Sequence, residues 1–473
     1  MHPRAGQFYI QGQWVSTASA ETFTVVNPAT EKPLGTLAMG TAGDVDAAVR
    51  AAAKAFPAFS ATTREERLAL LDKVIAIYKR RFDEIAATIT AEMGAPITFS
   101  QTNQTQVGLT HFEIARKVLA DYVFEKPFGN GVVQRVPVGV CGLITPWNWP
   151  SNQISLKVAP ALAAGCTMVL KPSEYSPFTA LIFAEIMDEA GVPKGVFNLV
   201  NGSGPVVGAA LASHPLVDMV SFTGSTRAGT DVAAKAAPTV KRVTQELGGK
   251  SANILLDDAD LALAVPDAVR RCFVNCGQSC SAATRLLVPH TLMGKVEEML
   301  VAHIATLKQG DPTNPAMDLG PVVSKIQWDR IQILLEKGIS EGAKVLVGGM
   351  GKPAGLETGY YVKPTVFTNV NNQMTIAQDE IFGPVLCVIG YETEDEAVAI
   401  ANDSRYGLGG AVFGSPERAL NVARRMRTGT VGVNGKGASA EMPFGGFKHS
   451  GNGREKGLFG FEEYLEVKAI ALS

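Results

Sequence analysis

The hydrophobic pattern between residues 140 and 249 alternates short apolar runs with stretches that are compatible with helices. The apolar runs predict strands at 140–145, 167–171, 196–200, 219–223 and 243–247. The sequences between them, for example NQISLKVAPALAAG and SPFTALIFAEIMDEAG, suit helices. Strands that are apolar throughout and separated by helices are typical of a parallel sheet covered on both faces. This part of the chain is therefore predicted to be an α/β domain with right-handed connections.

A polar or glycine-rich segment follows each of these strands. The segments are PWNWP (146–150), PSE (172–174), NGSGP (201–205), GST (224–226) and GGKS (248–251). Open parallel sheets bind ligands at the carboxyl ends of their strands, so all of these segments are expected to line one crevice. The glycines at 202, 204 and 208 and the GST segment open helices, and a helix start without bulky side chains suits a phosphate. The pattern predicts a dinucleotide-binding domain.

The rest of the chain shows two further patterns. Short strands and loops are predicted up to about residue 60, with helices at 43–56, 63–93 and 101–122. From residue 251 to about 435 a second α/β pattern predicts a separate catalytic domain, joined near Gly248 and Gly249. The segment 462–472 reads as a strand without a local partner, and such a strand is expected to pair with another subunit.

Composition narrows the class of protein. A length of 473 residues exceeds what one hydrophobic core usually organises, so two or more domains are expected. The apolar share of 46% and charged share of 19% are ordinary for a globular protein, and the net charge of −2 gives no basic surface for nucleic acid. No apolar run is long enough to predict a membrane span, and the first residues lack the apolar core of a secretory signal. A cytoplasmic protein is the expectation.

The cysteines do not form a disulfide framework, because six in this length are too few and too scattered. Cys272, Cys276 and Cys280 are spaced by four, which would place them on one helix face. Metal or iron–sulfur ligands usually come at other spacings with a fourth ligand nearby. No metal site is predicted, and a small buried hydrophobic residue is the simpler interpretation for most of them.

Three side chains are candidates for chemistry. Asn148 lies between Trp147 and Trp149 with proline at both ends, which suits either a buried turn or an amide held rigidly toward a reacting group. Cys280 lies in GQSCSAATR, where small neighbours leave a sulfur accessible for nucleophilic attack. Glu246 ends a buried strand, as either a hydrogen-bonded structural carboxylate or a general base with a raised pKa.

The motifs PWNWP, KPSE, FTGST, ELGGKS, GQSC, EIFGPV and PFGGFKHSGNGRE occur in this order over more than 300 residues. Together they resemble the NAD(P)-dependent aldehyde dehydrogenase superfamily, and the resemblance covers nearly the whole chain. It implies a Rossmann-type parallel-sheet cofactor domain, an α/β catalytic domain and a small β oligomerisation element. The cofactor domain would comprise residues 1–121 and 141–248, and the catalytic domain residues 249–445. The oligomerisation element would comprise residues 122–140 and 446–473.

The resemblance also implies a reaction. Cys280 would form a thiohemiacetal with an aldehyde, and Asn148 and the backbone N–H of Cys280 would stabilise the oxyanion. Hydride transfer to NAD would leave a thioester, which water activated by Glu246 would hydrolyse. Trp149, Ser279 and Ser281 differ from the commoner family residues and are expected to shape substrate choice. Hydrolysis is preferred, with acyl transfer to coenzyme A and a non-catalytic NAD-binding relative as alternatives.

The resemblance further implies which residues of this chain contact the cofactor, because they occupy the matching positions of the family motifs. Lys171 and Glu174 would bind the adenosine ribose, and Lys171 is counted with the catalytic residues as well. Gly224 and Ser225 would bind the pyrophosphate. Glu380 and Phe382 would bind the nicotinamide ribose and ring. Glu174 favours NAD by repelling a 2′-phosphate, while Lys171 leaves NADP possible. A homodimer or homotetramer is expected, built from residues 122–140 and the C-terminal strand. The other expected cofactor-binding residues are Ile144, Thr145, Trp147, Ser173, Gly204 and Leu247.

Overall fold

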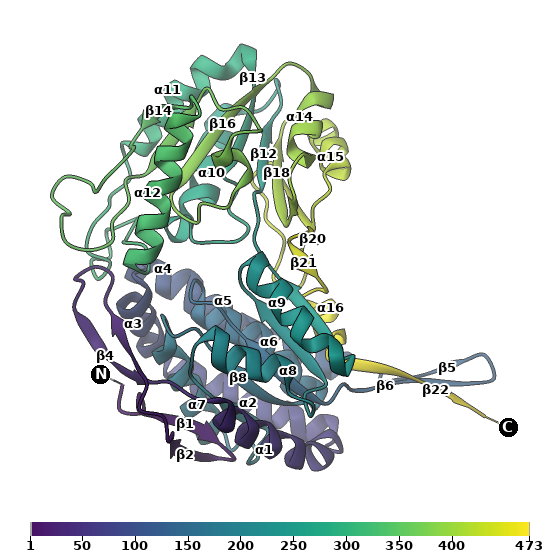
Figure 1. Ribbon diagram of the computed structural model, residues 1–473. Helices are drawn as coiled ribbons and strands as arrows, with labels where there is room; N and C mark the ends of the chain where they lie inside the picture. The colour runs from purple at the N-terminus through teal and green to yellow at the C-terminus, as the bar shows by residue number, and fades with distance from the viewer. Residues whose placement is uncertain (1, 473) are drawn as a thin grey trace.

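Two large sheets form the frame of the molecule, one in each half (Figure 1). The computed structural model describes residues 2–472. Within these residues the first sheet has eight strands in the order β2-β1-β9-β8-β7-β10-β11-β21. Its parallel centre contains the strands predicted from the sequence, which are β7 (Val140–Ile144), β8 (Thr167–Lys171), β9 (Phe197–Leu199), β10 (Met219–Thr223) and β11 (Arg242–Glu246). The predicted parallel α/β unit is confirmed.

Antiparallel strands close both edges of this sheet. The hairpin of β1 (Gln7–Ile10) and β2 (Gln13–Ser16) pairs with β9 at one edge. At the other edge β21 (Gly451–Asn452) pairs with β11, and Glu246 lies opposite Gly451. The C-terminal segment is therefore fixed beside the end of β11, where a candidate general base is located.

Helices cover both faces of the first sheet, as the apolar character of its strands requires. The predicted helix at 63–93 is two helices that meet at Arg81, and Gly94 ends the second with φ 84°. The predicted helix at 101–122 begins instead with a π-helical turn over Ser100–Thr105. The helices of this half are α1 (Ala42–Ser60), α2 (Arg64–Arg80), α3 (Phe82–Met93), α4 (Ile97–Phe99), α5 (Gln106–Asp121), α6 (Pro150–Ala164), α7 (Pro177–Glu189), α8 (Ala209–Ser213) and α9 (Thr226–Ala236).

The second sheet has the order β14-β15-β16-β13-β12-β18-β19, and all of its pairings are parallel except β14 with β15. Its strands are β12 (Ala252–Leu255), β13 (Arg285–Pro289), β14 (Lys344–Val347), β15 (Thr365–Thr368), β16 (Val385–Tyr391), β18 (Gly409–Phe413) and β19 (Thr430–Val433). Its helices are α10 (Leu261–Phe273), α11 (Met293–Ile304), α12 (Lys325–Ser340), α13 (Thr375–Gln378), α14 (Glu394–Asn402) and α15 (Pro416–Arg425). The expected second α/β pattern is thus present.

Three smaller strand groups complete the fold. The hairpin of β3 (Thr22–Val26) and β4 (Pro33–Ala38) precedes α1, and β17 (Tyr406–Gly407) pairs with β20 (Phe447–Lys448). The third group, β5 (Glu125–Phe128), β6 (Gly131–Pro137) and β22 (Leu465–Ala471), projects from the body as an arm (Figure 1). The short helix α16 (Gly457–Glu462) precedes β22. No helix among residues 2–472 is long and apolar enough to span a membrane.

Two sequence predictions are wrong in detail. The terminal strand β22 does have a partner in its own chain, because it pairs with β6 over its whole length, a contact that sequence proximity could not suggest. Cys272, Cys276 and Cys280 do not share a helix face, because α10 ends at Phe273. Cys276 lies in the following turn with φ 55°, so its thiol points to the carbonyl of Gly320, whereas that of Cys272 points to Val385.

Glu92 ties α3 to the start of α7. Its fully buried carboxylate accepts hydrogen bonds from the backbone N–H of Phe178 at 2.7 Å and of Thr179 at 3.0 Å, and from the Thr179 hydroxyl at 2.5 Å. We expect Glu92→Ala to lower the free energy of unfolding by about 3 kcal/mol, because these donors would lose a charged acceptor. Urea denaturation followed by circular dichroism measures this change. Glu336→Ala on the exposed side of α12 is the control, and an equal change in both variants would contradict the prediction.

Candidate active site

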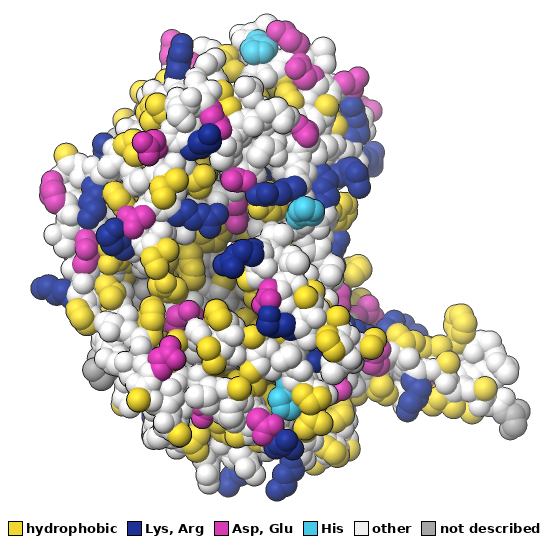
Figure 2. All heavy atoms as spheres, in the orientation of Figure 1, with side chains coloured by type: hydrophobic (Ala, Val, Ile, Leu, Met, Phe, Trp, Pro, Cys, Tyr) yellow, Lys and Arg dark blue, Asp and Glu magenta, His cyan; other side chains and the backbone are white. Residues whose placement is uncertain are grey.

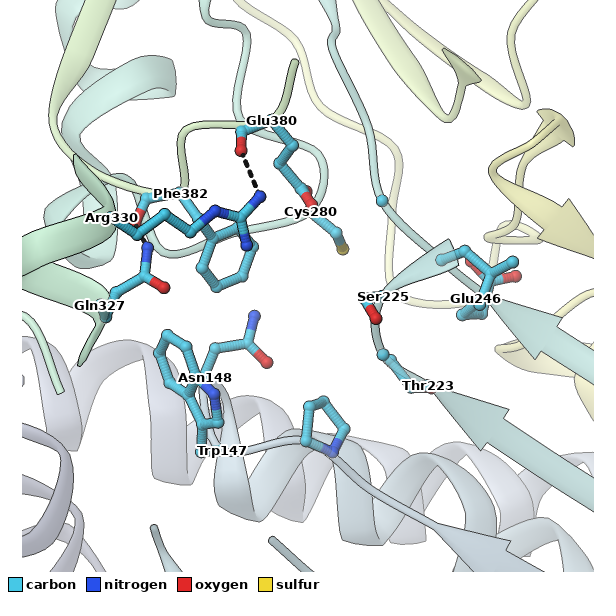
Figure 3. Close-up of a pocket in the computed structure, with 14 residues that line it drawn as sticks. Trp147, Asn148, Thr223, Ser225, Glu246, Cys280, Gln327, Arg330, Glu380 and Phe382 are labelled. Carbon is cyan, nitrogen blue, oxygen red and sulfur yellow. Dashed lines mark hydrogen bonds between the residues drawn. The ribbon is translucent and has the colours of Figure 1, made fainter. Parts of the chain in front are cut away.

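A cavity of about 160 Å³ lies where the carboxyl ends of the first sheet face the loops of the second half (Figure 3). It brings together segments that are far apart in the sequence, including the PWNWP turn, the end of β11, the Cys280 loop and one face of α12. Its lining residues are Pro146, Trp147, Asn148, Thr223, Gly224, Ser225, Glu246, Leu247, Gly248, Cys280, Gln327, Arg330, Glu380 and Phe382. The three candidate reactive side chains therefore share one cavity.

The Cys280 loop is shaped by unusual backbone conformations. After α10, Asn275 and Cys276 adopt φ 56° and 55°, and Gly277 follows with φ 71°. A side chain on Gly277 would overlap the backbone carbonyl of Gly383, so glycine is required where these two loops meet. The loop presents the sulfur of Cys280 toward the cavity (Figure 3).

Burial raises the pKa of the Cys280 thiol, and the neighbouring carboxylates of Glu380 and Glu246 raise that pKa further. The backbone N–H of Ser281 acts in the opposite direction but is the smaller effect. The thiol of the free protein is therefore protonated at neutral pH. Nucleophilic attack requires its proton to be removed, because the thiolate is the reactive form.

Hydrogen bonds hold both the backbone carbonyl and the side-chain amide of Asn148. It is 4% exposed, and its backbone carbonyl accepts hydrogen bonds from Asn275 Nδ2 at 2.8 Å and Gln104 Nε2 at 3.1 Å. Its own Nδ2 donates to the carbonyl of Gln278 at 3.0 Å. The indole N–H of Trp149 donates to Ser279 Oγ at 2.9 Å. The PWNWP turn is thus hydrogen-bonded directly to the Cys280 loop, and these bonds fix the position of the Asn148 amide relative to the Cys280 sulfur.

Glu246 ends β11 as a buried carboxylate, 2% exposed, and neither of its oxygens has a hydrogen-bond partner within residues 2–472. Burial raises its pKa well above the usual value, and Glu455 raises that pKa further. Lys157 acts against the increase while donating to Glu455 Oε1 at 2.6 Å and Ser221 Oγ at 2.9 Å. A buried, unpartnered acid with a raised pKa in a cavity has the properties of a general base or acid.

Residues of both halves form the cofactor side of the cavity. Ser225 caps α9 by accepting from the backbone N–H of Ala228 at 3.3 Å, and Gly224 precedes it without a side chain. Glu380 accepts from the backbone N–H of Gly249 at 3.2 Å, and burial raises its pKa to about 7. The rings of Trp147 and Phe382 meet edge to face, with centroids 5.3 Å apart. An anion, a hydroxyl group and a flat ring could each be bound here.

Sequence reasoning missed two residues that fix the loop at 380–382. Gln327 Nε2 donates to the carbonyl of Phe382 at 2.9 Å, and Arg330 donates to the carbonyl of Glu380 at 3.0 Å (Figure 3). Both project from one face of α12, three positions apart. Their only sequence signal is this helical spacing, which ordinary surface residues share.

Several predicted residues lie outside this cavity. Lys171 and Glu174 form an ion pair at 3.3 Å, and burial lowers the pKa of Lys171 while Glu174 opposes that decrease. The backbone N–H of Thr145 donates to the carbonyl of Lys171 at 3.1 Å, which keeps both on the same edge of the sheet. The predicted residues that are not part of the lining are Ile144, Thr145, Lys171, Ser173, Glu174 and Gly204.

A second cavity, of about 240 Å³, lies on the other side of Cys280. Helices α5, α6 and α10 and the C-terminal loops contribute to its lining, which is Val107, Trp149, Asn152, Gln153, Leu156, Arg271, Val274, Ser279, Cys280, Ser281, Ala282, Phe444 and Lys456. Cys280 is the residue shared by both linings. The sulfur therefore separates the side with the cofactor candidates from a second, partly apolar side. Trp149, Ser279 and Ser281 are part of this lining, and their role in substrate choice stays a prediction.

A family model for the aldehyde dehydrogenase family matches residues 14–470. The chain belongs to the aldehyde dehydrogenase family. A 3-succinoylsemialdehyde-pyridine dehydrogenase from a Pseudomonas species is 56% identical to it over 466 residues, which is 98% of each chain. The resemblance found in the motifs is thereby confirmed.

Solved aldehyde dehydrogenases share the whole fold. Aldehyde dehydrogenase C of Pseudomonas syringae, a mutant in complex with NAD⁺ and octanal, has a TM-score of 0.98 and 52% identity, covering 99% of this chain and 97% of the other. Betaine aldehyde dehydrogenase of Staphylococcus aureus, in complex with NAD⁺, has a TM-score of 0.95 and 38% identity, covering 98% and 94%. The α/β fold of this aldehyde dehydrogenase is that of the family.

The surroundings of Cys280 predict how this aldehyde dehydrogenase reacts with iodoacetamide. Because the thiol pKa is raised, we expect the alkylation rate of the free protein to keep rising above pH 9, and to be slow at neutral pH. Glu380→Gln should accelerate alkylation at about pH 8, because Glu380, with a pKa of about 7, is ionised there and its removal lowers the thiol pKa. Mass spectrometry of the Cys280 peptide measures both rates.

Glu336→Gln, an exposed change on α12, is the matched control for this experiment. The other cysteines among residues 2–472 are buried, so labelling should be selective for Cys280. A rate that levels off below pH 8 in the unmodified protein would show that the thiol pKa is not raised.

Proposed function

We propose that this chain oxidises an aldehyde to a carboxylic acid with NAD⁺, through covalent attachment of the substrate to Cys280. The observation that carries the proposal is that Cys280, Asn148 and Glu246 line one cavity although they lie far apart in the sequence. A nucleophile, an oxyanion donor and a base are the groups that this chemistry requires. NAD⁺ in the related structures supports the choice of cofactor.

The residues on the cofactor side fit a dinucleotide. The start of α9, with Gly224 and Ser225, offers backbone N–H groups to a pyrophosphate, and Glu380 offers a carboxylate to ribose hydroxyls. Phe382 and Trp147 would flank a nicotinamide ring, which would supply the hydride acceptor. Lys171 and Glu174, at the adjacent edge, would bind the adenosine ribose, where Glu174 favours NAD⁺ over NADP⁺ and Lys171 weakens that preference.

Cys280 begins the reaction by attacking the aldehyde carbon. Its thiol loses a proton, a sulfur–carbon bond forms, and the aldehyde oxygen gains the negative charge of a thiohemiacetal. Asn148 Nδ2 and the backbone N–H of Cys280 donate to this oxygen, and the contacts that fix the PWNWP turn to the Cys280 loop keep both donors in position. Loss of one such donor typically costs on the order of a hundredfold in rate.

Glu246 completes the cycle by taking a proton from water, which then attacks the thioester on Cys280. The carboxylate suits this step because it is buried, has no hydrogen-bond partner among residues 2–472 and has a raised pKa. These properties favour hydrolysis over acyl transfer to coenzyme A, which has its own nucleophile and needs no base for water. Residues 1–121 with 141–248 would bind the cofactor, and 249–445 would carry the nucleophile.

Replacement of Glu246 separates the two halves of the reaction. We expect Glu246→Gln to form about one equivalent of NADH per site in a rapid burst and then to turn over at least a hundredfold more slowly, because only hydrolysis requires the base. Stopped-flow absorbance of NADH measures both phases. Cys280→Ala is the matched control and should show neither phase. An unchanged steady-state rate in Glu246→Gln would remove this residue from the proposed role.

The substrate is proposed to enter through the second cavity. Its apolar wall, formed by Val107, Trp149, Leu156 and Phe444, suits the carbon chain of an aldehyde. One related structure contains octanal, and another relative is named for a semialdehyde that carries a pyridine ring. These relatives support a substrate with an extended carbon chain beyond the aldehyde group.

The projecting arm is proposed to assemble the protein into a homodimer or homotetramer. It exposes large apolar side chains, with exposed fractions of 76% for Phe128, 57% for Val467 and 56% for Leu472. Hydrophobic side chains are visible along the arm in Figure 2. Exposed strands with apolar side chains are expected to be covered by a partner, so residues 122–140 and 446–473 would contribute to the interface.

A charge on the arm should disrupt this assembly. We expect Val467→Asp to shift the protein from an oligomer toward a smaller species, because an ionised carboxylate would be buried without a partner at the interface. Light scattering after size-exclusion chromatography measures the mass. Val301→Asp on the exposed side of α11 is the control, since Val301 is also exposed but lies in the body of the protein. The same oligomeric mass in both variants would exclude the arm as the interface.

A further inference from the structure

Lys456 is a cation beside Cys280 that the proposed reaction does not use. It lines the second cavity together with Cys280, and none of the described residues in that lining is Asp or Glu. The other cation of the lining, Arg271, is engaged, because it forms an ion pair with Asp267 and donates to the carbonyl of Lys436 at 3.2 Å. The cavity thus offers positive charge without a balancing acid in its wall.

The ammonium group of Lys456 has no fixed partner. Within residues 2–472 no carboxylate lies within 4.0 Å of it, and no hydrogen bond to it is formed. The ammonium nitrogen lies over the face of the Phe444 ring, 4.8 Å from its centroid. Lys456 is half-buried, and a partly desolvated ammonium group gains from an acceptor. A ligand oxygen would supply the acceptor that the protein does not.

The backbone at Lys456 is strained. Its φ of 70° and ψ of 151° lie in a region that glycine occupies almost exclusively, although this residue carries a long side chain. Such strain costs on the order of 1–3 kcal/mol and persists mostly at functional sites. Glycine at this position would avoid that cost, so the side chain itself must contribute something. Its location beside the nucleophile indicates what that contribution is.

Burial lowers the pKa of Lys456, while Glu455, Cys280 and Glu246 raise it, in decreasing order of effect. Lys456 and Cys280 line the same cavity, so this side chain lies beside the site of the reacting sulfur. A half-buried ammonium group binds an acceptor oxygen more strongly than a fully exposed one would.

On the basis of the function proposed above, we infer that Lys456 determines substrate specificity by binding an acceptor oxygen on the carbon chain of the aldehyde. The substrate class is an oxo-aldehyde or an aldehyde acid, in which a ketone or carboxylate oxygen accepts from Nζ. The carbons between that oxygen and the aldehyde group lie along Trp149 and Leu156. Lys456 takes no part in the bond changes at Cys280.

The test compares three unbranched five-carbon aldehydes, pentanal, 4-oxopentanal and 5-oxopentanoate. They differ only at the two carbons farthest from the aldehyde group. The measured quantity is the ratio of kcat/KM for each oxygen-bearing aldehyde to kcat/KM for pentanal, from NADH formation. We expect Lys456→Met to lower at least one ratio by about 10- to 100-fold, because it removes a charge-assisted hydrogen bond. A fall confined to 4-oxopentanal identifies a ketone ligand, and one confined to 5-oxopentanoate identifies a carboxylate.

Further variants make the result specific. Lys456→Arg should retain most of the preference because it keeps a cationic donor, and Lys295→Met on the exposed start of α11 should leave all ratios unchanged. Lys456→Gly removes the side chain while accepting the same backbone angles, so it tests the proposal even if Lys456→Met does not fold. It should lower the same ratios as Lys456→Met.

Two outcomes would overturn the inference. Unchanged ratios in Lys456→Met and Lys456→Gly would show that Lys456 does not recognise the chain. An equal loss of kcat/KM with all three aldehydes would show that Lys456 affects the thiol or the stability of the fold, and not substrate specificity. If the unmodified protein formed no NADH with any of the three, the proposed function itself would fail, and this result is distinct from an unchanged preference.

Discussion

The active site depends on direct contact between three backbone segments, at positions where no side chain fits. A Cβ atom on Gly249 would overlap the carbonyl oxygen of Cys280, and one on Gly277 would overlap the carbonyl of Gly383. Gly248 is less restricted, because the nearest atom to its Cβ would be Glu380 Oε2 at 2.8 Å, at the end of a flexible side chain. The end of β11, the nucleophile loop and the loop at 380–383 are therefore locked together by their main chains. Because backbone contacts leave little freedom, the sulfur is placed accurately between two halves that are each built on a separate sheet.

This close assembly has an electrostatic consequence. It surrounds the Cys280 thiol with buried carboxyl groups, and Glu380, Glu246 and Glu455 all raise its pKa. A protonated thiol is a poor nucleophile and reacts slowly with oxidants. Lys157 limits the accumulation of negative charge by pairing with Glu455. The site is thus arranged so that reactivity appears only when the thiol proton has been removed.

The sequence predicted those parts of the structure that local rules determine. The parallel strands and the turns at their carboxyl ends follow from apolar runs and glycines, and the same pattern predicts that Asn148 and Glu246 lie on one edge of the sheet. Local sequence patterns did not predict the conformations that depend on contacts between residues far apart in the chain. The break at Arg81 has neither proline nor glycine. Cysteine normally avoids the left-handed conformation of Cys276, although asparagine tolerates the one at Asn275. Gln327 and Arg330 contribute through backbone carbonyls of another segment, so their own sequence carries no signal.

The two sides of Cys280 explain why the chemistry can be inferred from the sequence more easily than the substrate. The proposed cofactor side is built from turns with close backbone contacts, and a bound phosphate would restrict them further to glycine, serine and a few others. The other side is built from side chains of α5, α6 and α10, where many combinations of residues would pack equally well. A specificity residue on that side leaves no pattern in the sequence. The proposed role of Lys456 rests on three dimensions, because its strained backbone, its charge without an ion-pair partner among residues 2–472 and the cavity that it shares with Cys280 coincide at one position.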